Sequence, residues 1–388
     1  MSEWEMVKLS DLFDLQMGKT PSRNNSLFWR DGTNPWVSIS DISKSGKHIC
    51  ETKEMITDIG VKESRIKVVP KDTVIMSFKL SLGKTSITAK DLYTNEAIMA
   101  FHDKKFRKLD NNYIYYLFSN RDWGIETNKA VKGMTLNKAN LSNVNIPIPP
   151  INIQKQIASI LDSATEHISL RKQQLEEVDY LIKSQFIEMF GDPATNPMNH
   201  KITTLGEICS SISDGTHKTP VYLEDGIPFV SAKNIKHGKL DFSDIKYISE
   251  DEYTAIQKRC KTEKGDILLS KSGTLGVPAM VEVDYPFGIF ESLAVIKTQK
   301  DLVENKYLCE HLKGDFIQSQ FKTGTKGIAI KHLHLNVLKA VRVLLPSLSL
   351  QNRFADFVRA ADKSKFYIQK SVEESQLLFD SLMSQYFE

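Results

Sequence analysis

The chain has 388 residues, and its 51 Lys and Arg exceed its 48 Asp and Glu by a net charge of +3. Hydrophobic residues make up 41% and charged residues 26%, a globular composition that excludes a mainly disordered or collagen-like chain. The length predicts two or three domains. The slight positive charge is compatible with a polyanionic partner but does not by itself indicate one.

The sequence contains neither a membrane span nor a signal peptide. No apolar run approaches the 18 residues of a span, and the start, MSEWEMVKLSDLF, lacks the basic and apolar regions of a signal peptide. Four cysteines lie too far apart in sequence for a metal or disulfide motif: Cys50, Cys209, Cys260 and Cys309. We therefore expect a cytoplasmic protein with free thiols and no membrane partner.

The second half of the chain repeats the first at an offset of 193 to 199 residues. Pro35–Ser38 matches Pro228–Ser231 near the start of the match, and Gln154 falls on Gln351 near its end. The matches are collinear and span both halves, so they indicate an internal duplication. Two similar domains are therefore expected.

Within each half, short apolar runs between turn residues predict strands. They lie at 36–40, 73–77, 97–101 and 143–148, with counterparts at 228–232, 266–270, 292–296 and 341–345. Short helices are expected at 112–120 and 305–313. Each half is therefore predicted to begin with a domain of mixed α/β (α+β) class.

Each half ends in a segment without glycine or proline, at 152–190 and 350–387, which predicts one long helix. Seam positions recur at steps of three and four, at Leu161, Ala164, Ile168, Leu175, Val178, Ile182 and Met189, and at Val358, Ala361, Ile368, Val372, Phe379, Leu382 and Tyr386. Arg171 and Gln185 interrupt the first seam, and Lys365 and Ser375 the second. We expect the helices to pack together as an antiparallel coiled coil; alternatively, each covers its own domain.

The motifs of common catalytic sites are missing. Gly18-Lys19-Thr20 and Gly83-Lys84-Thr85 lack the glycine that a P-loop needs five residues earlier. No Gly-x-Gly-x-x-Gly follows a predicted strand, and Gly-x-Ser-x-Gly does not occur. His332-x-His334 could share one face of a strand, but without a third ligand nearby it is better explained as a surface pair than as a metal site. We assign no catalytic residue and no metal, and favour a binding protein.

Three polar, basic loops recur at equivalent places in the two halves. They are Gly18–Asn25 with Asp214–Pro220, Ser77–Lys84 with Ser270–Gly276, and Lys129–Lys138 with Lys322–Lys331. Lys and Arg neutralise phosphates, Ser, Thr and glycine-turn amides add neutral phosphate contacts, and Arg, Asn, Gln and His can read base edges. Any one loop could be a solvated turn, but the recurrence favours DNA binding. The candidate DNA-binding residues are Lys19, Arg23, Asn24, Lys79, Lys84 and Asn137 in the first half, and His217, Lys218, Lys233, Asn234, Lys271, Thr274 and Lys331 in the second.

Four segments carry a resemblance to a known family: Ile148–Ile157 (IPPINIQKQI), its echo Leu345–Phe354, the helix exit Met189–Pro193, and Asp214–Pro220. Over its whole length the chain resembles the specificity subunit of type I restriction-modification systems. The resemblance implies two target recognition domains joined by two long helices, with a pseudo-two-fold internal repeat. Each domain is expected to read one half of a bipartite, asymmetric double-stranded DNA site. The helices are expected to set the gap and to dock two methyltransferase subunits.

The resemblance also implies the cofactors and the domain bounds. S-adenosylmethionine comes with the partner methyltransferase, ATP and Mg come with restriction subunits, and this chain needs none. The recognition domains are expected at 1–150 and 192–346, and the spacer helices at 151–191 and 347–388.

Apolar residues beyond the seams are candidates for subunit docking: Ile153, Ile160, Phe186, Phe190, Phe357 and Phe387. The alternative is that they lie under their own domains. The glutamine in the first turn of each long helix either caps backbone N–H groups, which we favour, or marks a subunit contact.

Two other functions remain open from the sequence. A non-DNA adaptor would bind protein partners through the helices, and the basic loops argue against it. A self-contained nuclease or methyltransferase would need motifs that are missing.

Overall fold

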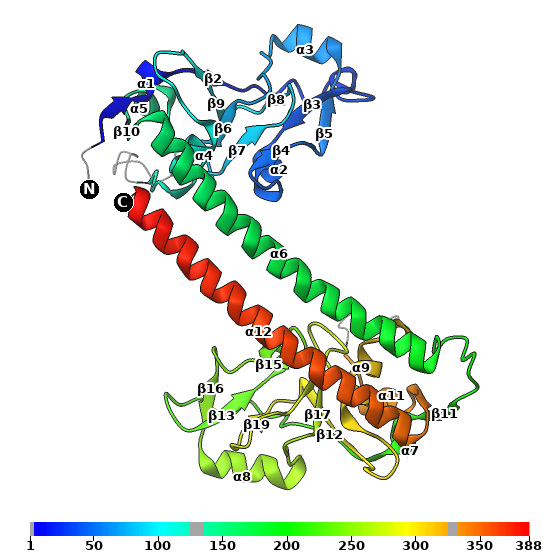
Figure 1. Cartoon of the computed structure of the whole chain (residues 1–388). Helices are drawn as coiled ribbons and strands as arrows, with labels where there is room; N and C mark the ends of the chain where they lie inside the picture. Colours follow the sequence, from blue (N-terminus) through cyan, green and yellow to red (C-terminus); the bar gives the residue numbers. More distant parts are fainter. Residues whose placement is uncertain (1–3, 125–135, 325–331, 388) are drawn as a thin grey trace. The chain divides into compact units, whose positions relative to one another are not determined.

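The computed structural model describes residues 4–124, 136–324 and 332–387. The chain divides into two compact units, residues 1–172 with 370–388, and residues 173–369. Both divisions fall inside long helices, α6 (Ile151–Phe190) and α12 (Leu348–Phe387), drawn in green and red in Figure 1. Each unit therefore contains one mixed domain and a segment of each long helix. Within the described ranges, no helix has the length and apolarity to cross a membrane.

The main sheet of the first unit has five strands in the order β2-β9-β6-β7-β4. Met17, the last residue of β2, pairs with Met99, and Ser77, the last residue of β6, pairs with Ile98. The ends of β2 and β6 therefore lie on either side of the start of β9. The elements are β1 (Met6–Lys8), α1 (Leu9–Leu12), β2 (Phe13–Met17), η1 (Ser26–Phe28), β3 (Asn34–Val37), α2 (Ile39–Lys44), β4 (His48–Ile49), β5 (Glu54–Ile56), α3 (Asp58–Ser64), β6 (Val74–Ser77), β7 (Thr85–Thr88), β8 (Tyr93–Thr94), β9 (Ile98–Asp103), α4 (Asn111–Asn120), α5 (Lys138–Ser142) and β10 (Asn145–Pro147).

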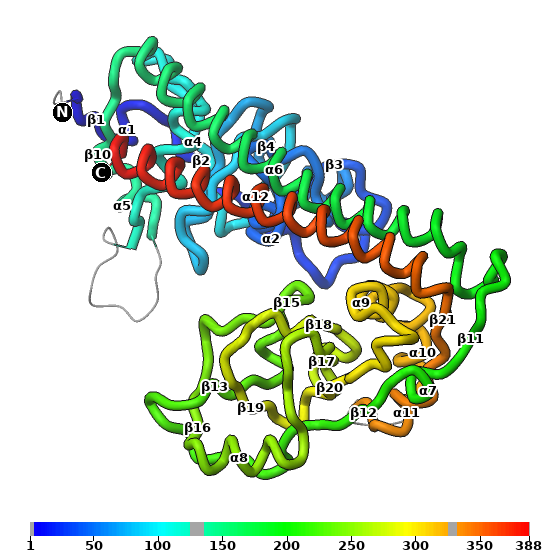
Figure 2. Tube along the Cα trace, turned by 60° about the horizontal axis from the view of Figure 1, so that its bottom comes forward, coloured from blue at the N-terminus to red at the C-terminus, as the bar shows by residue number. Residues whose placement is uncertain are grey.

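The main sheet of the second unit repeats this arrangement with four strands in the order β12-β20-β17-β18, and Figure 2 shows β12, β20 and β17 side by side. Asp214 ends β12 and pairs with Ala294, while Ser270 ends β17 and pairs with Leu293. The elements are β11 (Lys201–Thr204), α7 (Leu205–Ile208), β12 (Cys209–Asp214), β13 (Ile227–Val230), η2 (Ala232–Asn234), β14 (Ile235–Lys236), β15 (Lys239–Leu240), β16 (Lys246–Ile248), α8 (Glu250–Arg259), β17 (Ile267–Ser270), β18 (Pro278–Met280), β19 (Gly288–Ile289), β20 (Leu293–Thr298), α9 (Asn305–Lys313), α10 (Asp315–Gly324), α11 (Leu335–Lys339) and β21 (Arg342–Leu345).

These elements confirm the predicted strands and helices, with boundaries that move by a few residues. The largest differences are at the strand expected over 36–40, which is β3 at Asn34–Val37, and the one expected over 143–148, which is β10 at Asn145–Pro147. Ser38 ends β3 early because its side chain and Asp41 form a capping box that begins α2. Helices α8 and α10 were not predicted, nor were most of the other short elements, among them β2 and β12.

The predicted seams of the long helices are buried or half-buried at every position, including the four polar ones. In the first unit, the imidazole Nδ1 of His167 on α6 lies 3.2 Å from Ser375 Oγ on α12. In the second unit, Lys365 on α12 forms an ion pair of 2.6 Å with Asp179 on α6. The expected antiparallel packing is therefore confirmed within each unit, and two of the polar interruptions form contacts between the helices.

The alternative, in which each helix covers only its own domain, is wrong, because each long helix contributes to the cores of both units. Leu161 of α6 and Met383 of α12 belong to the first core, and Phe190 of α6 and Phe354 of α12 to the second. Burial of these side chains stabilises each unit by roughly 1.5–3 kcal/mol per residue.

The paired glutamines tie each long helix to its domain. Gln154 is fully buried; its carbonyl oxygen accepts from the backbone N–H of Asp110, and its amide donates to backbone carbonyls. Gln351 forms the same bonds with the N–H of Glu304 and with two carbonyls. The predicted role in satisfying backbone N–H groups is confirmed, but the group satisfied begins α4 or α9 rather than the long helix itself.

Candidate nucleic-acid interface

In both units the first two predicted loops leave the same end of the main sheet. Loop 18–25 follows β2 and loop 77–84 follows β6, and both strands end beside the start of β9. In the second unit, loops 214–220 and 270–276 follow β12 and β17 beside the start of β20. The strand register therefore brings together loops that lie about 55 residues apart in sequence.

The second loop has the same backbone turn in both units. The Gly83 N–H donates to the Ser77 carbonyl at 2.9 Å, and the Gly276 N–H donates to the Ser270 carbonyl at 2.8 Å. Both glycines have positive φ, +79° and +74°, and an added Cβ would collide with an aromatic ring. The turn is thus part of the duplicated scaffold, whereas the side chains on it differ.

The end of the third loop joins the same place. The Leu136 N–H donates to the carbonyl of Phe78 at 3.0 Å, and the Leu333 N–H donates to the carbonyl of Lys271 at 2.9 Å. Most of this loop, with the candidate Lys331, lies outside the described residues. In each unit, the first two loops and the residues that end or directly follow the third therefore meet at one end of the sheet.

Four first-unit candidates lie at this end, and the ammonium of one of them, Lys19, donates to the Ser64 carbonyl at 2.5 Å. Lys19, Asn24 and Lys84 are exposed and Lys79 is half-exposed. Lys84 Nζ donates to Ser43 Oγ at 2.6 Å, a solvent-accessible contact that a phosphate oxygen could replace. These four remain predicted DNA contacts.

Arg23 is held by its own domain. Its guanidinium pairs with both carboxylate oxygens of Glu54, at 2.5 and 3.0 Å, and stacks 3.9 Å from the ring centroid of Trp29 and 4.7 Å from that of Trp36. A bidentate pair uses the fork that would otherwise read a guanine. Arg23 can therefore contact a base only through its other guanidinium N–H donors or after an exchange of partners.

Asn137 has a structural role, because its side chain accepts from the Asn140 N–H as the N-cap of α5. It is nevertheless exposed. A capping oxygen contributes about 1 kcal/mol to helix stability, so its predicted DNA contact would have to come from its amide nitrogen.

Two second-unit candidates were wrongly placed at the surface. Asn234 is 3% exposed and forms a capping box with Ser231 at the start of η2, while its amide donates to two backbone carbonyls. Lys271 is 1% exposed, and its ammonium is paired with the carboxylate of Asp214. Neither side chain is available for DNA, because each satisfies a buried polar group inside the domain.

The remaining second-unit candidates are accessible. Lys218 and Thr274 are exposed, and the side chain of Lys233 is half-exposed and lies 3.4 Å from Asp244. The His217 ring is fixed between two carboxylates, with Nε2 3.4 Å from Asp214 and Nδ1 2.6 Å from Glu291. These four remain predicted DNA contacts.

Asp214 also binds Arg259, a residue that the sequence analysis missed. Arg259 Nη2 donates to Asp214 Oδ1 at 2.8 Å, and its side chain is 54% exposed. Burial alone would raise the pKa of Asp214, but the hydrogen bonds from Lys271 and Arg259 outweigh it and lower that pKa. The carboxylate is thus ionised and faces two cations. No local sequence signal pointed to Arg259, since it lies 45 residues from Asp214.

His332 and His334, which directly follow the third loop, lie next to this cluster. The ring centroids of His332 and His334 are 5.2 Å apart. Burial, together with the positive charge of Lys271, lowers the pKa of His332. In the described parts of the chain, no group of three or more His, Cys, Asp or Glu side chains is placed to hold a metal ion.

The predicted docking residues lie mostly against the cores of the two units. Phe186 and Phe190 are 9% and 0% exposed and lie in the second core, where Phe186 stacks on Tyr307 and Phe190 meets Phe354 edge to face, so their assignment to a docking surface is wrong. Their own unit covers them because the end of α6 packs between α9 and α12. The other predicted docking residues are partly buried, and all but Ile160 pack against a core: Ile153, Ile160, Phe357 and Phe387.

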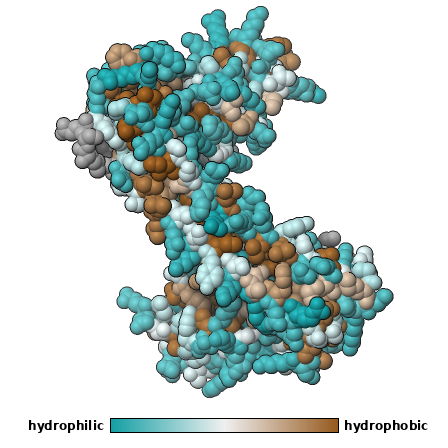
Figure 3. Space-filling view, viewed as in Figure 1, coloured by the Kyte–Doolittle hydropathy of each residue, from teal (hydrophilic) through white to brown (hydrophobic). Residues whose placement is uncertain are grey.

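Other apolar side chains of the helices are exposed instead. Brown apolar surface lies over the long helices in Figure 3. On the helix segments of the first unit these residues are Leu170, Leu377 and Leu378, and on those of the second unit they are Tyr180, Leu181, Ile187, Phe366 and Tyr367. Their exposed fractions range from 48% to 73%. Their positions lie outside the predicted seams, so the sequence pattern alone could have identified them as exposed apolar residues.

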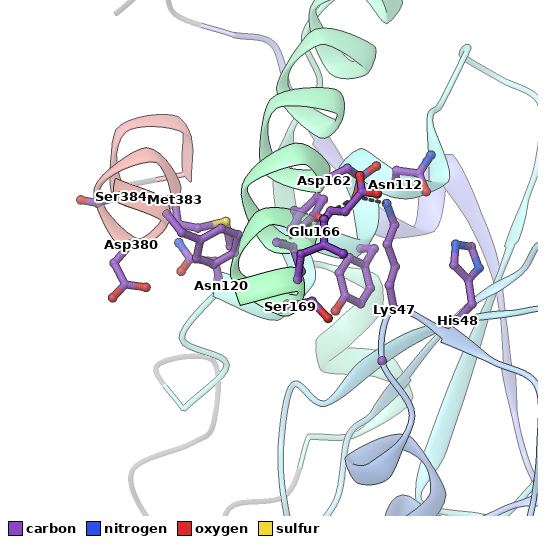
Figure 4. Close-up of a pocket in the computed structure, with 17 residues that line it drawn as sticks. Lys47, His48, Asn112, Asn120, Asp162, Glu166, Ser169, Asp380, Met383 and Ser384 are labelled. Atoms are coloured by element: carbon purple, nitrogen blue, oxygen red, sulfur yellow. Dashed lines mark hydrogen bonds and ion pairs between the residues drawn. The ribbon is translucent and has the colours of Figure 1, made fainter. Parts of the chain in front are cut away.

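A cavity of about 1010 Å³ in the first unit lies between its domain and its helix segments. Figure 4 shows Lys47 reaching Asp162 on α6, and this ion pair measures 2.5 Å. Tyr116 donates to the same carboxylate at 2.6 Å. In the second unit, Lys306 and Asp362 form an ion pair of 2.5 Å between α9 and α12. Each domain is therefore fixed on its helices by a lysine–aspartate pair.

The chain thus contains two domains of one duplicated fold, each packed on paired helix segments. In each domain, polar loops gather at one end of the main sheet. This arrangement is typical of a protein with two binding domains. Residues 1–180 and 197–376 both match the family described as type I restriction modification DNA specificity domain. The match covers most of the chain, and the chain belongs to this family.

The chain is similar to curated specificity subunits and to a solved structure over most of its length. The MjaIX specificity subunit of Methanocaldococcus jannaschii is 24% identical over 98% of this chain and 92% of its own. The EcoBI specificity subunit of Escherichia coli is 23% identical over 72% of this chain and 65% of its own. The crystal structure of the type I S subunit from M. genitalium matches with a TM-score of 0.61 at 19% identity, covering 99% of this chain and 96% of that one.

Proposed function

We propose that this chain is the DNA specificity subunit of a type I restriction-modification complex. The observation that carries the proposal is the gathering of polar loops at the equivalent sheet end of both units, within a chain of the specificity-domain family. Each unit reads one half of a bipartite DNA site. Because the side chains on the two sheet ends differ, the two half-sites differ in sequence.

The chemistry of the loops suits this division of work. Exposed lysines such as Lys19, Lys84 and Lys218 supply phosphate contacts, which position a domain on the duplex without reading sequence. Side chains that present paired donors or acceptors in the major groove supply the sequence discrimination.

The helices set the unread gap and bind the partner subunits. Exposed aromatic side chains on them, such as Phe366 and Tyr367, are of the residue types that are enriched at protein–protein interfaces. The partners are two methyltransferase subunits and, in the full complex, restriction subunits. S-adenosylmethionine enters with the former, ATP and Mg with the latter, and this chain acts as a non-catalytic recognition subunit in the cytoplasm.

Genome-wide mapping of methylated bases tests this function. Cells that express the chain together with its cognate methyltransferase subunit are compared with cells that express the methyltransferase alone. We expect one split motif, methylated only when the chain is present. Unchanged methylation, with an intact complex of the two proteins recovered from the same cells, would reject the proposal in favour of a non-DNA adaptor.

A further inference from the structure

The second unit contains a buried charge cluster that its first-unit counterpart lacks. Asp214, the last residue of β12, is 5% exposed and contacts Lys271, Arg259 and His217. Lys271 directly follows β17 and is also buried. A buried lysine–aspartate pair is costly to desolvate, and apolar residues often replace such pairs without loss of stability.

The first unit has no ion pair at the equivalent positions. At the end of β2, where β12 has Asp214, it has Met17, which is 51% exposed. After β6, where β17 is followed by Lys271, it has the buried Phe78. The strand register and the backbone turn are otherwise the same. The shared fold therefore forms in the first unit without this ion pair, so the pair can serve a role other than defining the fold.

The cluster presents one cation to solvent. Lys271 is enclosed, and the ring nitrogens of His217 face Asp214 and Glu291. Arg259, by contrast, ends α8 with 54% of its side chain exposed. Its bond to Asp214 uses one of the five guanidinium N–H donors, so others remain for a ligand. Asp214 also lies at the sheet end where the loops meet, so Arg259 is held beside them.

We propose that Arg259 reads a guanine in the half-site of the second unit, and that Asp214, anchored by Lys271, is its positioning residue. This inference rests on the proposed function of DNA recognition. A guanidinium fixed by a carboxylate loses less conformational freedom when it binds, and it can donate to O6 and N7 of a guanine in the major groove. Glu54 occupies two donors of Arg23 in a bidentate pair, whereas Asp214 occupies one donor of Arg259, so the two units are not equivalent in this respect.

The test uses the chain with its methyltransferase and maps the methylated motif for the wild type, Arg259→Ala, Arg259→Lys and Asp214→Asn. We expect Arg259→Ala to lower methylation at wild-type sites about 5- to 150-fold relative to sites changed at one guanine. One position of one half-site should relax, while the other half-site and the gap stay the same. Arg259→Lys, which keeps the charge but loses the planar fork, should relax the same position. Asp214→Asn should relax it partly.

Lys264→Ala is the matched control. Lys264 forms an exposed ion pair with Asp284 before the start of β17, at the opposite end of the strand, and its variant should keep the wild-type motif. Thermal unfolding of each purified chain separates a reading defect from a folding defect. An unchanged motif at unchanged efficiency in Arg259→Ala would overturn the inference, and so would a uniform loss at all sequences, which indicates a phosphate contact. Absence of any motif with the wild type would instead reject the proposed function.

Discussion

The two units share a scaffold and differ at its functional end. Both tie the long helix to the domain through a buried glutamine with three backbone hydrogen bonds. At the sheet ends, however, Met17 and Phe78 of the first unit occupy the positions that the charged residues Asp214 and Lys271 occupy in the second. The buried contacts under the helices therefore maintain the fold in both units. The side chains at the loop ends can differ in charge and polarity without changing that fold.

A second difference lies in the core. His311 is buried in the second unit and its Nε2 accepts from the Leu344 N–H at 3.1 Å. The repeat aligns His311 with Leu117, which is buried, and Leu344 with Pro147. Proline has no N–H to satisfy, so the first unit needs no acceptor there. The second unit thus has both the Leu344 N–H donor and its His311 acceptor, and the first unit has neither.

The largest expected effect is on stability, and it comes from truncating Phe190, one of the helix residues that were predicted to dock a partner subunit. Phe190→Ala should lower the free energy of unfolding of the second unit by about 3–5 kcal/mol, because it empties a site surrounded by Tyr307 and Phe354. Ile187→Ala, one turn earlier and 48% exposed, is the control and should cost less than about 0.5 kcal/mol. Equal costs in chemical denaturation would contradict the assignment of Phe190 to the core.

Acid should destabilise the second unit through His311. Burial lowers the pKa of His311 to about 3, whereas an unfolded histidine titrates near about 6.5. Between these pH values the unfolded chain binds a proton that the folded chain does not. The free energy of unfolding should therefore decrease as pH falls below about 6.5, by about 1.4 kcal/mol per pH unit and about 2 kcal/mol at pH 5.

The double variant His311→Leu with Leu344→Pro copies the first unit and should remove this contribution. The measurement is denaturant unfolding at a series of pH values, followed by a probe in the second unit. An identical pH dependence of the wild type and the double variant would show that His311 does not carry it.

A smaller effect is expected at the exposed part of the helices. Phe366→Ala should weaken binding to the methyltransferase subunit by about 1–2 kcal/mol, because its side chain is 60% exposed and stacks beside Tyr367. Stability should stay within about 0.5 kcal/mol of the wild type. Lys363→Ala, on an exposed position of the same helix, serves as the control in a titration of the two proteins. Equal affinity of the Phe366 variant and the wild type would remove this residue from the interface.

The smallest effect concerns single phosphate contacts. Lys84→Ala should reduce the slope of log affinity against log salt by about 1 in the assembled complex, since one phosphate contact is lost. The motif should not change. Lys90→Ala, an exposed lysine beyond β7, is the control; a slope that stays the same for Lys84→Ala would exclude the contact.

The sequence predicted the duplication, the two long helices and the position of the loops, because these follow from periodicity and from matched turns. It did not predict which loop side chains are buried. Lys271 follows a strand like any exposed lysine, and only its partner Asp214, 57 residues away, explains its burial. Arg259 was missed for the same reason. Phe190 was misassigned because an apolar residue outside a helix seam can face either a partner or its own domain.

An exchange of the first domain tests the central claim most directly. Residues 1–150 are replaced by the corresponding segment of a relative with a different motif, the helices and second unit are kept, and methylated bases are mapped across the genome. We predict that one half of the methylated motif changes to that of the donor, while the other half and the gap stay as in the wild type. A motif in which both halves change together would contradict the claim that each unit reads its own half-site.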